Sequence, residues 1–477
     1  IENPDVEAAF GIRTDDVPSN AILSPRFGFN WDVYGDQSTQ FRGGVGLFTG
    51  RQPFVWLSNL YSNTGRATVQ FTCRSSLGNL PEFTLDPAAQ PESCAGTGVP
   101  APPRAVINLI DEDFEFPNAW RFDVAVDREL PWWGIVGTAE LIYTKYQNQI
   151  FLEEINVDKD PVSFTQGGRP VFGTHSPGVS TGNNNLIPIP NYLHPEFLQT
   201  VLLTNSDQDR AWNFILQAQK RYSDGVEFSG SYTFNQAEDI SGLTSSIATS
   251  NIGFNPVPGN PNDPPLATSN YQQTHKFVMG GSFDVADWFT WSLMYVGNSG
   301  DKYSYVYNGD VNADGFEAPS ANDRVNDLLY VPTGPEDITL LDPADWDELN
   351  SYIETEACLR EARGEIIERN TCDAPWRNRF DTRFTFKVPT IAGQHGELVW
   401  DIFNVGNLLN EDWGRSSGVN FGTIELLALR GWDEENNRGI FDINRLNVGD
   451  DGAADPFTVF DTNSRWQMQF GVRYAIN

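Results

Sequence analysis

The sequence predicts an all-β fold, a transmembrane antiparallel β-barrel to which this chain contributes the C-terminal portion, with long extracellular loops and one short loop helix. Two patterns predict it: apolar and polar residues alternate within segments, and the connections alternate between short and long. Composition agrees, because aromatic residues make up 13% of the 477 residues while the mean hydropathy is −0.39. A chain that is both aromatic and hydrophilic must separate the two kinds of residue by face or by segment.

Alternation with a period of two is the pattern expected of half-buried strands. In residues 26–33, Phe27, Phe29 and Trp31 share one face, whereas Arg26 and Asp32 share the other. The same split between an apolar and a polar face recurs along the whole chain. It predicts eleven strands, at residues 22–34, 39–51, 119–130, 134–148, 210–222, 226–237, 273–285, 288–299, 377–389, 397–405 and 464–476.

The connections between these strands alternate in length. Short turns such as YGDQS, ELPW and VADW are followed by long segments rich in Pro, Gly, Asn and Asp, at residues 52–118, 149–209, 238–272, 300–376 and 406–463. Short turns at one end and long loops at the other are typical of bacterial outer-membrane barrels. A soluble all-β protein is the alternative, but it would rarely tolerate so many long connections without structure of their own.

Aromatic residues gather beside the predicted short turns, as in the girdle that lies at a membrane interface. These residues are Trp31, Tyr34, Trp132, Trp133, Tyr222 and Trp288. Bacterial barrels use even numbers of strands, whereas eleven is odd. We therefore expect residues 1–477 to be the C-terminal part of a barrel, with the first strands and any preceding domains absent from this chain.

One segment breaks the β pattern. Trp346, Leu349, Ile353 and Ala357 recur at helical spacing, and Pro343 stands where the first turn of a helix accepts proline. The opposite face is too polar for a membrane span. The pattern predicts one short amphipathic helix that packs within a long loop.

The charge balance excludes some partners. The formal net charge is −33, so nucleic acid and anionic membrane surfaces would be repelled. Such a chain is better suited to binding cations or to a saline habitat.

The four cysteines fall into two close pairs, Cys73 with Cys94 and Cys358 with Cys372. Each pair lies within one loop segment, which predicts two local disulfides and an oxidising compartment. A zinc site is the alternative, but neither CxxC spacing nor a nearby histidine supports it.

The segment GDVNADGFEAPSANDRVND resembles the first half of an EF-hand calcium loop. Oxygen ligands at alternate positions precede a glycine that allows a sharp turn, and a backbone carbonyl follows. The twelfth position is Ala321, so the usual bidentate carboxylate would have to come from just downstream. The predicted Ca²⁺ ligands are Asp310, Asn312, Asp314, Phe316, Asp323 and Asp327, with an Asx-rich turn that binds no ion as the alternative.

Enzyme motifs are weak, and we expect no catalytic residues. Gly178, Ser180 and Gly182 satisfy GxSxG, but the surrounding Pro- and Asn-rich sequence does not predict the strand and helix that a nucleophile elbow needs. The adjacent Glu153 and Glu154 are interpreted as a solvated strand end rather than a catalytic pair.

Several passages resemble the Oar-like branch of TonB-dependent outer-membrane receptors. They are LSPRFGFNWDVYGD with the strand and loop that follow it, PWRNRFD at Pro375–Asp381, WDIFNVGNLLNEDWG at Trp400–Gly414, and the final SRWQMQFGVRYAIN. The order and spacing of these passages carry the likeness. It implies a barrel of about 22 strands in a Gram-negative outer membrane, preceded by a plug that contacts the TonB complex.

The resemblance also implies roles for the polar strand faces and the loops. Arg379, Asp381, Arg383, Arg465 and Arg473 would face the lumen and hold the plug by polar contacts, with contact to a substrate that passes through the barrel as the alternative. Aromatic loop residues would offer surfaces to an unknown extracellular substrate: Trp56, Tyr61, Tyr303, Tyr305 and Tyr307. The implied function is energy-coupled uptake of a nutrient, with a calcium-stabilised adhesion barrel that transports nothing as the alternative.

Overall fold

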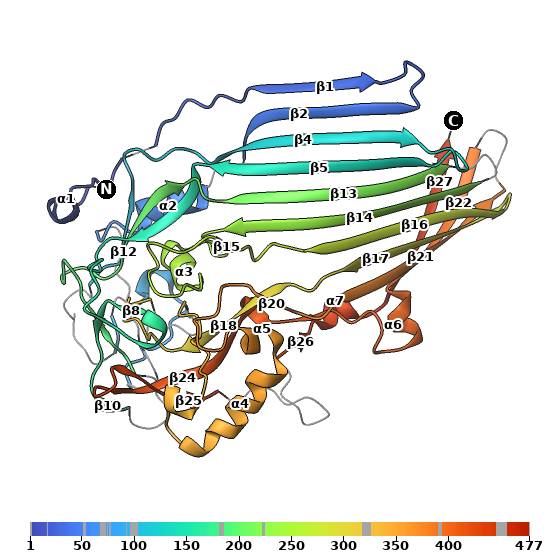
Figure 1. The fold of residues 1–477 in the computed structure, drawn as a ribbon. Helices are drawn as coiled ribbons and strands as arrows, with labels where there is room; N and C mark the ends of the chain where they lie inside the picture. The colour runs from blue at the N-terminus through green and yellow to red at the C-terminus, as the bar shows by residue number, and fades with distance from the viewer. Residues whose placement is uncertain are drawn as a thin grey trace.

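The computed structural model consists of one wide antiparallel sheet and a layer of folded loops at one end of it (Figure 1). It describes residues 2–476 with the exception of 17, 51–53, 67–72, 74, 76–77, 92, 96–103, 181–185, 222–224, 317–325, 390–393 and 445–455.

Eleven long strands pair in chain order to form the sheet, so the predicted number and sequence of strands are confirmed. They are β1 (Arg26–Asp32), β2 (Thr39–Thr49), β4 (Asn118–Glu129), β5 (Val136–Gln147), β13 (Arg210–Arg221), β14 (Val226–Asp239), β16 (His275–Ala286), β17 (Phe289–Asn298), β21 (Arg377–Val388), β22 (Gln394–Phe403) and β27 (Gln467–Ile476). The short β15 (Ala267–Thr268) pairs antiparallel with the end of β14. In the described part of the chain, β1 pairs only with β2 and β27 only with β22.

The register of the sheet places apolar side chains on one face and polar side chains on the other. One row of directly opposed residues runs through Trp31, Phe41, Val126, Ala139, Leu216, Tyr232 and Phe277. On the opposite face, a second row runs through Gln40, Asp127, Thr138, Gln217 and Ser231. Leu216, in the middle of β13, is 43% exposed in the isolated chain. A sheet with so many uncovered apolar residues needs an apolar surrounding.

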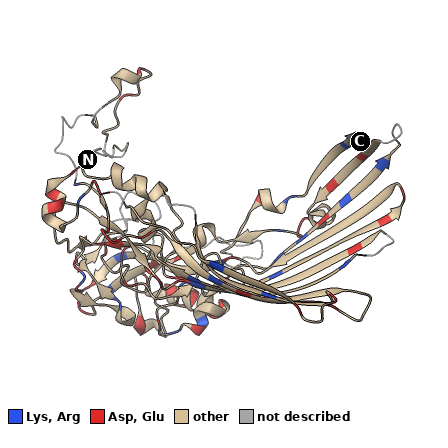
Figure 2. Ribbon diagram, turned by 90° about the horizontal axis from the view of Figure 1, so that it is seen from above, with Lys and Arg blue, Asp and Glu red and all other residues tan. Residues whose placement is uncertain are grey.

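Seen from above, the sheet is a curved, open arc with the loop layer at one end (Figure 2). The short turns lie at the other end, where Trp31, Tyr34, Trp132, Trp133 and Trp288 are all more than half exposed. This is the position expected of an interfacial girdle. Tyr222 lies outside the described residues.

The long loops are not structureless, which corrects the sequence-based expectation. Segments from different loops pair with one another. For example, β18 (Lys302–Asn308) lies parallel to β24 (Thr423–Asp433), and β12 (Thr200–Ser206) lies parallel to β3 (Ile107–Ile110). Three clusters of buried apolar side chains fill this layer, and the largest contains Tyr305, Leu329 and Phe441. The loops therefore form a folded layer with its own core.

The loop strands form two sheets of three or more strands and three short pairs. The larger sheet contains β10 (Gly178–Val179), β18 (Lys302–Asn308), β19 (Thr339–Leu340), β20 (Cys372–Asp373), β24 (Thr423–Asp433) and β25 (Arg438–Ile443). The smaller contains β3 (Ile107–Ile110), β6 (Gln149–Glu154) and β12 (Thr200–Ser206). The pairs are β7 (Ser163–Phe164) with β8 (Pro170–Val171), β9 (Gly173–Thr174) with β11 (Ile189–Pro190), and β23 (Ser417–Gly418) with β26 (Thr458–Val459).

The predicted loop helix is present, but it is broken and is not alone. Pro343 opens a 3-10 turn, after which Leu349 and Ile353 bury the apolar side of α4, and the extended backbone of Glu356 separates α4 from α5. The helices are α1 (Pro4–Phe10), α2 (Phe54–Ser62), α3 (Ala248–Gly253), α4 (Trp346–Thr355), α5 (Ala357–Glu361), α6 (Val405–Leu409) and α7 (Asp461–Ser464). The 3-10 turns are η2 (Pro87–Ala89), η3 (Gln166–Gly168), η4 (Pro335–Asp337), η5 (Pro343–Asp345) and η6 (Asn420–Gly422). No helix in the described ranges has the length and apolar character that a membrane crossing requires.

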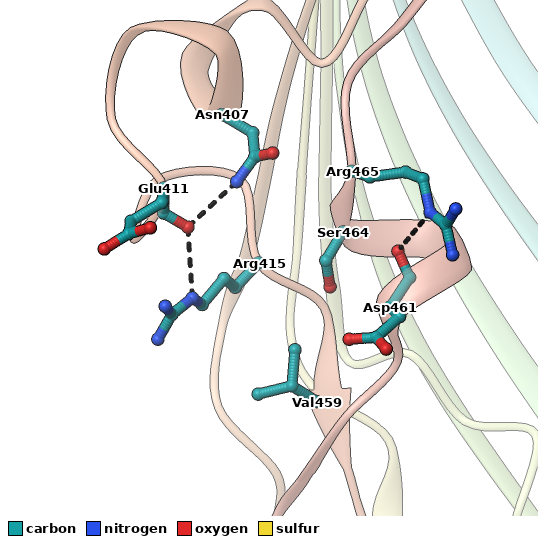
Figure 3. Close-up of a pocket in the computed structure, with 7 residues that line it drawn as sticks. All are labelled: Asn407, Glu411, Arg415, Val459, Asp461, Ser464 and Arg465. Atoms are coloured by element: carbon teal, nitrogen blue, oxygen red, sulfur yellow. Dashed lines mark hydrogen bonds between the residues drawn. The ribbon is translucent and has the colours of Figure 1, made fainter. Parts of the chain in front are cut away.

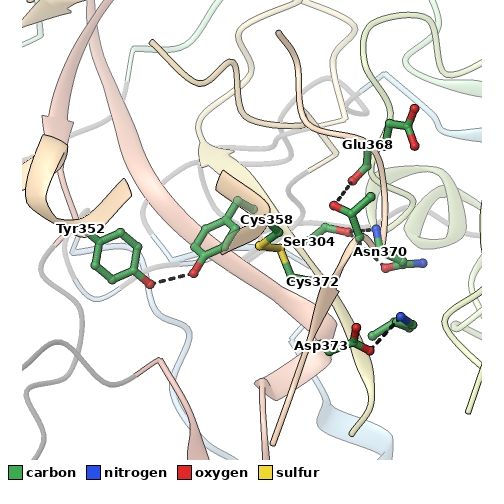
Figure 4. Close-up of a disulfide and its surroundings, with 10 residues drawn as sticks. Ser304, Tyr352, Cys358, Glu368, Asn370, Cys372 and Asp373 are labelled. Carbon is green, nitrogen blue, oxygen red and sulfur yellow. Dashed lines mark hydrogen bonds and ion pairs between the residues drawn. A yellow bond between two sulfur atoms is a disulfide. The ribbon is translucent and has the colours of Figure 1, made fainter. Parts of the chain in front are cut away.

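Both predicted disulfides are present, Cys73 with Cys94 and Cys358 with Cys372. The second joins α5 to β20, whose Cys372 lies opposite Tyr303 of β18 (Figure 4). It therefore ties the loop helices to the main sheet of the loop layer.

Replacing this bridge in Cys358→Ser/Cys372→Ser should lower the free energy of opening of the loop layer by about 3 kcal/mol. Without the bridge, the opened chain gains conformational entropy that is worth about this free energy for a loop of this length. Hydrogen exchange of peptides from β18 and β20 measures the change. The matched control is Cys73→Ser/Cys94→Ser, which lies outside this core and should leave exchange in β18 unchanged. Equal protection of β18 in all three proteins would contradict the prediction.

Candidate functional site

The described residues of the acidic segment, 310–316 and 326–327, are buried in the loop layer rather than displayed on its surface. Asp310, Asn312, Asp314 and Asp327 are each at most 2% exposed. The glycine of the motif has a left-handed backbone, with φ of +83° at Gly315, as the calcium-loop pattern expects. The structure thus brings five of the six predicted ligands together around one turn, because Phe316 is also buried there and its amide donates to Oδ1 of Asp314 at 2.9 Å. The sixth, Asp323, lies outside the described residues.

Backbone amides donate hydrogen bonds to several side-chain oxygens of this cluster. The Asp314 and Gly315 amides donate to the two carboxylate oxygens of Asp310 at 3.1 and 2.9 Å. The amides of Val311 and Asn312 donate to Oδ2 of Asp327 at 2.7 and 3.1 Å. These contacts make an Asx-rich turn, which fits a calcium loop as well as a turn that binds no ion.

One buried cation compensates part of the negative charge. The Arg169 guanidinium donates to Asp327 Oδ1 at 2.6 Å, and both side chains are 1% exposed. Asp327 is therefore an ion-pair partner rather than a free ligand. The described residues contain no group of three or more His, Cys, Asp or Glu side chains placed to hold a metal ion. Calcium binding by the six predicted residues stays a prediction.

Glu154 belongs to the same acidic region, although the sequence suggested a solvated strand end. It is only 2% exposed at the end of β6, which corrects that interpretation. Burial raises the pKa of Glu154 to about 8, and the Asp314 carboxylate adds to the shift. Burial also raises the pKa of Asp314 to about 6, and that of Asp310 well above its usual range.

Four of the five charged residues predicted to face the lumen form ion pairs within or between the last strands. Arg383 of β21 donates to Asp401 of β22 at 2.5 Å, directly opposite in the register. Arg473 of β27 contacts Glu397 at 3.2 Å. Arg379 contacts Asp381 at 2.8 Å. These ion pairs belong to the polar face of the last strands, and the predicted contact with a plug stays a prediction.

Arg465 is placed differently from the expectation. It precedes β27 at the end of α7, and its Nε donates to the backbone oxygen of Asp461 at 3.3 Å. It lines an open pocket of about 460 Å³ (Figure 3). The other lining residues are Asn407, Glu411, Arg415, Val459, Asp461 and Ser464. Arg415 and Asn407 both donate to the Glu411 backbone oxygen, so the pocket wall is held by backbone contacts.

The loop aromatics do not form the predicted substrate surface. Tyr303, Tyr305 and Tyr307 belong to β18 and are at most 2% exposed, in the core of the loop layer. Trp56 is half-buried and donates to the Ser245 backbone oxygen at 2.9 Å, whereas Tyr61 is 39% exposed. Of the five predicted aromatic residues, Tyr61 has the side chain most accessible to a molecule outside the protein.

The first residues of the GxSxG motif pair with a strand of the loop layer. Gly178 pairs with Trp432 of β24, and the Ser180 amide donates to the Arg430 backbone oxygen at 2.7 Å. The nearby His175 ring stacks on Trp432 with centroids 3.7 Å apart, and its Nε2 lies 3.3 Å from the Asp310 backbone oxygen. Gly182 lies outside the described residues.

A family model described as "Outer membrane beta barrel domain" matches residues 16–431. No curated protein matches the sequence. Among solved structures, the chain is similar to the outer membrane transporter YddB from Escherichia coli, with 10% identity and a TM-score of 0.43, over 95% of this chain and 41% of that chain. It is also similar to the ferric enterobactin receptor PfeA, with 9% identity and a TM-score of 0.40, over 95% and 40%. For the siderophore receptor PirA from Acinetobacter baumannii the values are 7% and 0.37, over 80% and 37%.

Proposed function

The chain belongs to the outer membrane beta barrel domain family, and from this premise we propose that it is part of the barrel of a TonB-dependent receptor of the Oar-like branch. It lies in the outer membrane of a Gram-negative bacterium. In this proposal the barrel binds a scarce nutrient at its extracellular loops, and the TonB complex releases it into the cell by moving a plug.

The width and polarity of the sheet are the observations that support this proposal most. Eleven strands already form an open arc with two unpaired edges in the described residues, so closing it requires further strands. A barrel much wider than eleven strands has a lumen that side chains alone cannot fill. The charged pairs on the polar face suit contact with water or a polar plug.

Uptake by the full-length protein tests the proposal. Cells that carry the gene are compared with cells that lack it, each with and without TonB, while mass spectrometry follows which solutes leave a nutrient-poor medium. We expect at least one solute to be depleted only when the gene, TonB and the inner-membrane proton gradient are all present. Depletion that persists without TonB or after uncoupling would identify a passive pore instead. Surface binding without any depletion would favour the adhesion barrel.

A further inference from the structure

A small cavity lies among three of the long loops, beside the acidic turn. Glu154 of β6 lines it from the segment between β5 and β13, and Asn260 and Asn262 line it from the segment between β14 and β16. Asp314 lines it from the segment between β17 and β21. The volume open to the centre of a water-sized sphere is about 10 Å³, which is room for a single water molecule or ion.

One carboxylate oxygen in this cavity has no hydrogen-bond partner among the described residues. Glu154 Oε1 accepts from the amides of Asn156 and Thr200 at 2.8 and 3.0 Å. Oε2 of the same carboxylate is buried and accepts no hydrogen bond from the described residues. An orphaned buried carboxylate oxygen is costly unless an unseen group contacts it.

The donors around Asp314 favour an ionised carboxylate at the other wall. Its Oδ1 accepts from the Phe316 amide at 2.9 Å, and its Oδ2 accepts from the Asn312 and Asn326 side-chain amides at 3.0 and 2.7 Å. Within the described residues, neither Asp314 nor Glu154 forms an ion pair, since Arg169 contacts Asp327 instead. Two buried carboxylates that share one cavity either take up a proton, as the raised pKa of Glu154 indicates for the cavity without an ion, or are compensated by a positive charge between them.

We propose that this cavity binds a divalent cation, with Ca²⁺ as the ion that suits it, held by Glu154 Oε2 and the Asp314 carboxylate. Ca²⁺ takes carboxylate, amide and water oxygens in irregular arrangements, whereas Mg²⁺ demands a nearly regular octahedron. A site at the junction of three separate loops offers an irregular arrangement of oxygens, as Ca²⁺ accepts. The cation contacts the acidic turn from outside, rather than sitting within it as the sequence motif suggested.

A cation bound in this cavity would connect segments of the loop layer that are far apart in the sequence. The three segments that meet here contribute to different parts of the loop layer, and Asn262 already joins two of them by accepting from the Glu154 amide at 2.8 Å. A bound cation would hold all three in one arrangement. This inference does not depend on the transport proposal, because it concerns how the loop layer is held together.

The Lys159 ammonium is the competing counter-ion. Lys159 lines the same cavity, but its side chain is largely exposed and forms no ion pair with Glu154 or Asp314 in the described residues. A flexible exposed ammonium gains little from such a contact. Calorimetry and thermal unfolding distinguish Ca²⁺ from Lys159 as the counter-ion.

The test uses the full-length protein in detergent micelles after EDTA treatment and dialysis. Calorimetry with CaCl₂ should give one site that is lost in Glu154→Gln and in Asp314→Asn, and Ca²⁺ should raise Tm in the parent protein only. Glu153→Gln is the matched control, with the same change of charge one residue away, and should keep the response. MgCl₂ should bind at least tenfold more weakly.

A crossover in stability distinguishes a ligand from a residue that only maintains structure. In EDTA, Glu154→Gln should be at least as stable as the parent, because the buried cavity favours a neutral group there when no cation is bound; in Ca²⁺ it should be less stable. If the parent shows no binding or Tm shift at millimolar Ca²⁺, the proposal is overturned. The same holds if Glu154→Gln still binds Ca²⁺, or if Lys159→Met lowers the Tm in EDTA while Ca²⁺ stabilises neither protein.

Discussion

Leu216→Arg should lower the free energy of unfolding in a lipid bilayer by about 2–4 kcal/mol, because an arginine near the midplane of a barrel's lipid face must reach water at a cost of that size. Leu216 stands in the middle of β13, between Ala139 and Tyr232 on the apolar face. Chemical unfolding of the intact protein refolded into vesicles measures the loss.

The adjacent Gln217→Arg is the matched control, since it places the same side chain at the same depth on the opposite face. Gln217 lies opposite Thr138 and Ser231 and in the same row as Asp127, so a new guanidinium there finds polar neighbours. We expect a change of less than about 1 kcal/mol. Similar losses in both variants would show that the two faces have been assigned wrongly.

The membrane-spanning sheet could be predicted from the sequence because its rule is local. Each strand alternates with a period of two, and each pairs with the next along the chain, as β13 does with β14. No knowledge of distant segments is needed to place such residues on a face. That is why all eleven strands were found where the alternation indicated them.

The loop layer could not be predicted in the same way, because distant segments create its core. Tyr305 is buried on β18, which pairs with β24 more than a hundred residues later in the chain. The burial of Glu154 likewise depends on Asn262, which is 108 residues away. A local pattern shows an acidic or aromatic residue in a polar segment, and only the tertiary contacts show that it is enclosed.

The acidic motif could be found in the sequence because the spacing of its residues is a local pattern. The contacts that decide its chemistry could not be found in that way. The pattern correctly indicated a tight turn with Asp310 and Asp314 close together. It did not reveal that Arg169, from another loop, already pairs with Asp327. Nor did it reveal the unpartnered oxygen of Glu154. Which carboxylates remain available to a cation is decided by those distant contacts.

Arg169→Met should destabilise the loop layer by about 3–5 kcal/mol, the largest loss expected from any single substitution considered for this layer. Removing one member of a buried ion pair leaves the other charge without compensation in a medium that solvates it poorly. Asp327 would then keep only the amides of Val311 and Asn312 as partners. The Leu328 backbone oxygen would also lose the donor that Arg169 supplies.

Hydrogen exchange of β18 and β24 peptides, measured in the intact protein with Ca²⁺ in excess, gives this loss as a change in the free energy of opening. Arg169→Met/Asp327→Asn should recover much of it, because an uncharged amide keeps an acceptor for the backbone donors and carries no buried charge. Arg13→Met removes an exposed pair with Asp15 and should cost less than about 1 kcal/mol. If the double variant is no more stable than Arg169→Met alone, the cost lies in lost packing of the arginine stem and not in the uncompensated charge of Asp327.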